Sequence, residues 1–134
     1  MKNVEHIGIA VKELEAAERL FSSLLNSQPY KRETVASEGV LTSFFQVNQT
    51  KIELLQSIDP EGVIARFIEK KGEGVHHVAF EVDDIVLEME RLKKEGFALL
   101  SETPKPGADN KLVCFLHPKT TNGMLIELCQ EIKP

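Results

Sequence analysis

Apolar and polar residues alternate along two similar stretches of the chain, residues 4–11 and residues 75–82. In the first stretch, His6 shares one face with small residues, and the opposite face is aliphatic. Alternation with a period of two predicts a half-buried β-strand. The second stretch places His77 on one face in the same way. Each half of the chain is therefore predicted to open on a strand that carries a histidine.

Each of these strands is followed by apolar residues with helical spacing. Residues 14–25 present one apolar stripe, which predicts an amphipathic helix that ends at Asn26, a residue that tolerates a helix C-cap. In the second half, Asp83 and Asp84 precede a helix with Ile85, Met89 and Leu92 on its inner face. Both helices are expected to cover the aliphatic face of the preceding strand.

Three further strands are predicted after each helix. They cover residues 30–35, 40–47 and 51–56 in the first half, and 97–100, 112–116 and 124–129 in the second. Asn48 and Gln49 form a tight turn, and residues 103–111 and 117–123 form loops of the kind that often carry function. Residues 58–74 form a connector with one or two helical turns.

The final strand of each half carries nearly the same sequence. Lys51-Ile-Glu-Leu-Leu-Gln56 returns as Leu125-Ile-Glu-Leu-Cys-Gln130, and the distance from histidine to glutamate is 47 residues in one half and 50 in the other. A repeat of this period identifies a tandem architecture. The sequence therefore predicts an α+β protein with two βαβββ modules, residues 1–57 and 75–134, joined by the connector in a single domain.

Composition restricts the possible functions. The 134 residues are 42% hydrophobic and 28% charged, as is ordinary for a globular protein. A net charge of −5 argues against a nucleic-acid partner, because no basic stripe is available to neutralise phosphates. No apolar run is long enough to cross a membrane, and Met1 leads straight into a strand pattern without a signal peptide. Two cysteines without framework spacing predict free thiols and a cytoplasmic location.

Two glutamates stand among aliphatic neighbours in the final strands, Glu53 and Glu127. A carboxylate in a half-buried strand is costly unless it is paired, and a cation would offset that cost. Together with His6 and His77, the glutamates form a donor set that suits a divalent transition ion and leaves two octahedral positions open. A lone strand histidine is usually a core residue and a strand-end glutamate is usually solvated, but the paired recurrence favours the metal site.

Three other polar residues have less specific interpretations. His76 is expected on the opposite strand face from His77, and His117 on a loop at the rim of the site. Cys129 shares a face with Glu127, where it lines a cavity or serves as small apolar filler.

The paired modules resemble the vicinal oxygen chelate superfamily and, within it, the methylmalonyl-CoA epimerase family. The resemblance covers the whole chain. It is carried by seven segments: His6–Val11, Thr50–Leu55, Ile64–Gly72, Gly74–Ala79, Pro106–Ala108, Phe115–Lys119 and Ile126–Leu128. It implies a cupped, eight-stranded mixed sheet, a homodimer, an acyl-CoA substrate, and metal ligands at His6, Glu53, His77 and Glu127. The implied ion is Co²⁺, with Mn²⁺, Ni²⁺ and Zn²⁺ as alternatives.

This resemblance implies interconversion of (2R)- and (2S)-methylmalonyl-CoA through a metal-stabilised enolate. Proton removal and return on opposite faces need two bases, and pseudo-twofold symmetry offers Glu127 and Glu53. The chain departs from some epimerases, which have a catalytic glutamate at the position of Thr42 and a glutamine at that of Glu53. We therefore expect Glu53 to take the role of the missing base, with Lys111 and Lys119 as partners for the CoA phosphates.

Three other functions are compatible with the same ligands or fold. A glyoxalase I-type isomerase would use the same residues on a thiol hemithioacetal. A metal-free member of the superfamily would bind a small ligand, although the intact ligand set counts against it. An extradiol dioxygenase needs only three protein ligands to its iron and fits least well.

Overall fold

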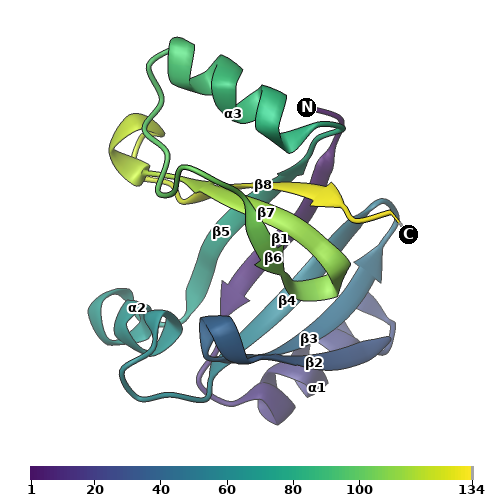
Figure 1. The fold of residues 1–134 in the computed structure, drawn as a ribbon. Helices are drawn as coiled ribbons and strands as arrows, with labels where there is room; N and C mark the ends of the chain where they lie inside the picture. The colour runs from purple at the N-terminus through teal and green to yellow at the C-terminus, as the bar shows by residue number, and fades with distance from the viewer. Residues whose placement is uncertain (134) are drawn as a thin grey trace. The chain divides into compact units, whose positions relative to one another are not determined.

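The structure is a computed structural model that describes residues 1–133 (Figure 1). It consists of two compact units, each of which is described by itself. Residues 6–76 form one unit, and residues 1–5 together with the chain from residue 77 onward form the other. The boundary between the two units falls between the adjacent histidines, His76 and His77.

The unit of residues 6–76 contains most of the first module and the connector. Its strands pair in the order β2-β3-β4-β1; β1 and β4 run parallel, and the other pairs are antiparallel. Its elements are β1 (Val4–Ala10), α1 (Leu14–Leu25), β2 (Lys31–Val35), η1 (Ala36–Glu38), β3 (Val40–Val47), β4 (Thr50–Ser57) and α2 (Val63–Lys71).

The other unit repeats this plan. Its strands pair in the order β5-β8-β7-β6, with β5 and β8 parallel and the other pairs antiparallel. Its elements are β5 (Gly74–Glu81), α3 (Ile85–Lys94), β6 (Lys105–Gly107), η2 (Ala108–Asn110), β7 (Lys111–Leu116), η3 (Pro118–Thr120) and β8 (Ile126–Glu131). Each unit thus has the strand order of one βαβββ module, so the predicted α+β fold class with two βαβββ modules is confirmed.

Turn chemistry follows the sequence closely. Asn26 ends α1 in the left-handed conformation (φ 52°, ψ 48°), and Asn48 adopts φ 56° in the two-residue loop between β3 and β4. Asparagine tolerates this region better than most residues because its short amide side chain bonds locally. The predicted helix end and the predicted tight turn are both confirmed.

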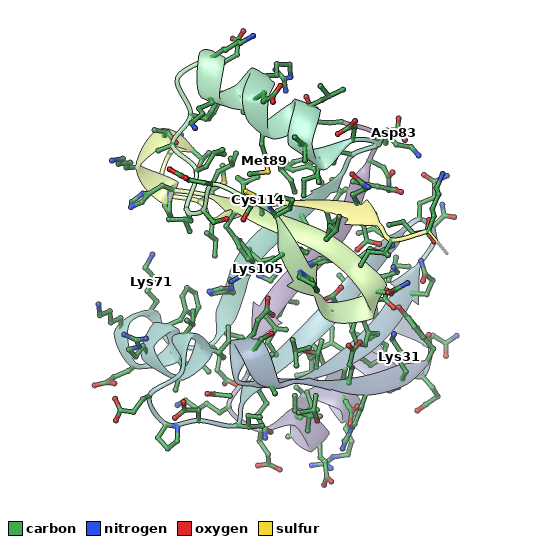
Figure 2. The ribbon with its side chains drawn as sticks, viewed as in Figure 1. Lys31, Lys71, Asp83, Met89, Lys105 and Cys114 are labelled. Carbon is green, nitrogen blue, oxygen red and sulfur yellow. The ribbon has the colours of Figure 1, made fainter. Side chains whose placement is uncertain are left out.

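A hydrophobic core lies between the helix and the strands of each unit. In the first, Leu14 and Phe21 of α1 pack against Phe45 and Leu54 of β3 and β4. In the second, the predicted inner stripe of α3 is buried against β7 and β8. Figure 2 shows Met89 of α3 beside Cys114 of β7 in this core. The aliphatic strand faces are thus covered by helices, as the alternation predicts.

The prediction of a strand over residues 97–100 is wrong. Leu99 forms only one isolated bridge, to Leu116, and its side chain packs with Phe97 against the core under α3. β7 pairs with β8 on one side, and the strand on its other side is β6, which lies inside the predicted loop 103–111. Gly107 permits this pairing, since a Cβ there would meet a Val113 methyl at 2.9 Å. The apolar run of residues 97–100 therefore serves packing rather than strand pairing.

The connector is also more ordered than predicted. In place of one or two helical turns, it forms the nine-residue helix α2, which ends at Gly72. His76 lies edge-on against the ring of Phe67 in this helix, with 4.9 Å between ring centroids. No helix within residues 1–133 is both long and apolar enough to cross a membrane.

A glutamine ties the last strand of each module to the start of its helix. The Gln56 side chain accepts a hydrogen bond from the backbone N–H of Leu14 at 2.6 Å, and Gln130 accepts one from Ile85 at 2.7 Å. The first N–H groups of a helix have no partner within the helix, so these bonds satisfy otherwise orphaned donors. The matching glutamines of the sequence repeat therefore have a structural role.

We expect Gln56→Leu and Gln130→Leu each to lower the free energy of unfolding by about 1–3 kcal/mol, because each leaves a partly buried donor unsatisfied. Chemical denaturation followed by circular dichroism measures this loss. Gln49→Leu, at an exposed turn position, is the matched control and should change it by less than about 0.5 kcal/mol. Equal effects for all three variants would contradict the role of the glutamines.

Candidate active site

In the unit of residues 6–76, parallel pairing of β1 with β4 brings a histidine beside a glutamate. The register aligns His6 with Lys51 and Gly8 with Glu53, so Glu53 lies one diagonal step from the imidazole on the same face. His6 Nδ1 and Glu53 Oε2 are 3.1 Å apart, and the two residues are only 5% and 4% exposed. Gly8 has no side chain to separate the pair.

The other unit contains an equivalent pair. β5 and β8 are parallel, and Ala79 aligns with Glu127, so Glu127 again lies one step diagonally from His77. His77 Nε2 and Glu127 Oε1 are 3.1 Å apart in a buried environment. The ring of Phe115 stands edge-on to His77, with centroids 5.9 Å apart at 84°. The predicted residues therefore form two buried His–Glu pairs, one in each unit.

The geometry of each pair suits metal coordination. Ligands about 2.1 Å from an ion are about 3.0 Å apart at a right angle and about 3.4 Å apart at a tetrahedral angle. The 3.1 Å separation of nitrogen and oxygen in each pair lies within that interval. Imidazole nitrogen and carboxylate oxygen are both common ligands of divalent transition ions. The residue types and the spacing within each pair thus fit a divalent ion.

Two phenylalanines frame the pairs, and the sequence interpretation missed both. Phe44 on β3 aligns with Glu53, and Phe115 on β7 aligns with Glu127. Each aromatic ring therefore shares a strand face with its carboxylate and limits the access of water to it. A signal existed in the sequence, because both strands carry a phenylalanine at the matching position of the repeat.

Cys129 and His117, which were also considered from the sequence, have structural contacts. Cys129 is fully buried in an apolar cluster with Ala79, Val113 and Phe115, which agrees with the role of small filler. His117 Nδ1 accepts a hydrogen bond from the backbone N–H of Lys119 at 3.1 Å and so orders the turn at η3.

Comparison with known proteins places the chain in a family. Residues 5–115 match the model of the Glyoxalase/Bleomycin resistance protein/Dioxygenase superfamily. The chain belongs to this superfamily. The predicted fold class is that of the family, and the resemblance stated from the sequence motifs is confirmed.

Similar proteins narrow the relationship to one kind of enzyme. The chain is 41% identical over 129 residues to an ethylmalonyl-CoA/methylmalonyl-CoA epimerase of Cereibacter sphaeroides, with 95% of this chain and 96% of that protein covered. The human mitochondrial methylmalonyl-CoA epimerase is 39% identical over 128 residues, with 95% and 73% covered. These relatives are epimerases, which are enzymes.

A solved structure gives the same result. The Streptomyces coelicolor methylmalonyl-CoA epimerase, in a variant complexed with 2-nitronate-propionyl-CoA, superposes with a TM-score of 0.94. The sequences are 26% identical, and the match covers 100% of this chain and 99% of that one. The ligand of that neighbour is an acyl-CoA.

Neither cysteine forms a disulfide, as the composition predicts, and both are buried. Burial raises the pKa of the Cys114 thiol, so less of the reactive thiolate is present at a given pH. We expect neither thiol to react with Ellman's reagent in the native protein at mildly alkaline pH, and two thiols per chain to react after denaturation. Rapid labelling of the native protein, or no labelling after denaturation without reductant, would contradict this prediction.

Proposed function

We propose that this protein interconverts the (2R) and (2S) epimers of methylmalonyl-CoA by removing and returning the proton on C2. The observation that carries the proposal is the buried pair of one imidazole and one carboxylate, repeated in both modules of a chain whose relatives are epimerases of this substrate. The reaction needs a base on each side of a planar intermediate, and the repeat supplies two carboxylates for this role.

We propose further that the two pairs serve one divalent ion, with His6, Glu53, His77 and Glu127 as its ligands. The separation of the two donor atoms within each pair supports this assignment. A bound divalent ion would supply Lewis-acid stabilisation of the negative charge that develops on the thioester oxygen. The four donors suit Co²⁺, and Mn²⁺, Ni²⁺ or Zn²⁺ would be accepted by the same set.

The proton transfers are assigned to Glu127 and Glu53. Both carboxylates are buried, and each has a ring or small residue beside it that limits hydration. Glu53 is the base of its module, since Thr42 on the neighbouring strand has no group that accepts a proton near neutral pH.

The proposal predicts exchange of the C2 hydrogen with solvent. We expect the protein to release tritium from 2-³H-methylmalonyl-CoA, and a chelator to abolish the release until a divalent ion is restored. Glu53→Gln should lower the rate by about 10²- to 10⁴-fold, because an amide cannot accept the proton. Glu69→Gln, at an exposed position of α2, is the control and should keep the normal rate.

Three results would argue against all or part of the proposal. Near-normal turnover of a metal-loaded Glu53→Gln protein would remove Glu53 from the mechanism. Formation of lactoylthiol from a thiol hemithioacetal, without exchange into methylmalonyl-CoA, would identify the glyoxalase-type activity. If metal analysis of the active protein finds no ion, the metal-free reaction would have to be explained by protein groups alone.

Metal content tests whether the two pairs act together. We expect one divalent ion per chain after dialysis, and its loss in both His6→Ala and His77→Ala. Two independent sites would instead give two ions in the native chain and one in each variant. His76→Ala is the matched control, because this residue is adjacent to His77 but its ring lies against Phe67. Elemental analysis by mass spectrometry measures the ratio.

Other properties implied by the family resemblance stay predictions. A homodimer, contacts of Lys111 and Lys119 with the CoA phosphates, and a cytoplasmic location are expected. Sedimentation of the purified protein measures the first. The change in KM for methylmalonyl-CoA on Lys111→Ala and Lys119→Ala measures the second.

A further inference from the structure

One buried polar atom near Glu53 has no hydrogen-bond partner. Thr42 is 1% exposed, and its Oγ1 is the single buried side-chain nitrogen or oxygen without a partner within residues 1–133. Buried hydroxyls are nearly always hydrogen-bonded, because an unsatisfied one loses its contact with water and gains nothing in return. An exception of this kind calls for a specific explanation.

The strand register places this hydroxyl on the face of β3 and β4 that carries Glu53. Phe44 aligns with Glu53, and Thr42 aligns with Leu55, two residues farther along β4. Side chains two residues apart on a strand share a face, so Thr42 is a diagonal neighbour of Glu53. On its other side, Thr42 aligns with Glu33 of β2. The unpartnered hydroxyl therefore belongs to the surroundings of a proposed catalytic carboxylate.

The second module shows that the fold does not require a hydroxyl here. Val113 holds the corresponding position: it aligns with Cys129, two residues beyond Glu127, as Thr42 aligns with Leu55, two residues beyond Glu53. Val113 is 3% exposed and packs in an apolar cluster. Valine and threonine have nearly the same shape, so a valine would fill the site in the first module without the cost of an unsatisfied polar group.

We propose that the Thr42 hydroxyl donates a hydrogen bond to an oxygen of the malonyl group of the bound substrate; this inference rests on the proposed function. A hydroxyl has one hydrogen to donate, and the thioester and carboxylate oxygens of a malonyl group are acceptors only. The group remains neutral, so it adds no negative charge beside Glu53 and Glu33. Thr42 thus binds and orients the substrate, while Glu53 transfers the proton.

Substitution by valine separates this role from a structural one, because stability and binding should change in opposite directions. Thr42→Val removes an unsatisfied buried group and should raise Tm by about 2–5 °C. It should also weaken binding of malonyl-CoA by about tenfold and lower kcat/KM for methylmalonyl-CoA by a similar factor, since a hydrogen bond to the ligand is lost. Thr42→Ser, which keeps the hydroxyl, should bind malonyl-CoA normally.

The internal repeat supplies the control. Val113→Thr places the same hydroxyl at the equivalent position of the other module and should lower Tm with no gain in affinity for malonyl-CoA. Propionyl-CoA, which lacks the free carboxylate, identifies the oxygen that accepts the hydrogen bond. If Thr42→Val weakens binding of propionyl-CoA and malonyl-CoA equally, the acceptor is the thioester oxygen. If it weakens binding of malonyl-CoA alone, the acceptor is the carboxylate. Isothermal titration calorimetry measures all of these affinities.

Two outcomes would overturn the inference. If Thr42→Val binds malonyl-CoA as tightly as the native protein, the hydroxyl does not contact the ligand. If Thr42→Val lowers Tm, the hydroxyl is satisfied within the folded protein. Because the affinities are measured without turnover, they decide this question even if the native protein fails to exchange the C2 hydrogen, a result that would count against the proposed function alone.

Discussion

Parallel pairing between the first and last strands of each module is the constraint on which the candidate site depends. His6 and Glu53 are far apart in the chain, as are His77 and Glu127, yet each pair is adjacent because β1 lies beside β4 and β5 beside β8. The offset is the same in both units, with the glutamate two residues past the residue aligned with the histidine. A slip of one residue in either register would move the carboxylate to the helix-covered face.

Burial gives these pairs their chemical character. The residues aligned with the two glutamates on the histidine strands are Gly8 and Ala79, which leave space beside the carboxylates, and the aligned residues on the other side are phenylalanines. A carboxylate in such surroundings is poorly hydrated and interacts strongly with any cation or proton nearby. Small residues on one side and phenylalanines on the other thus keep the surroundings of both carboxylates largely apolar.

Most of the fold could be predicted because its pattern is local. Alternation identified β1 and β5, helical spacing identified α1 and α3, and asparagine marked the ends of elements. The failures were non-local. Residues 97–100 form a short apolar run like that of a strand, but two of them pack against the core under α3, whereas β6 depends on the close approach of Gly107 to Val113. Neither fact can be read from a window of neighbouring residues.

The residues of the candidate site could be predicted for a different reason. The same metal-ligating residue types recur at matching positions of the two modules. Two histidines and two glutamates recur in register, and the structure brings them together as two pairs. The sequence did not show which residues align across neighbouring strands. The positions of Phe44 and Phe115 beside the two glutamates were therefore not predicted. The hydroxyl of Thr42 could not be recognised as unsatisfied either, because that property depends on every neighbour in the folded state.

The glutamines at positions 56 and 130 give each repeated segment a role on both sides of the sheet. Each follows its glutamate by three residues and points to the opposite side of the strand, where it holds the first turn of a helix. Each six-residue segment therefore carries a glutamate of the candidate site on one side of the sheet and a glutamine that holds a helix start on the other. A substitution that distorts either segment therefore disturbs both the candidate site and the attachment of the helix.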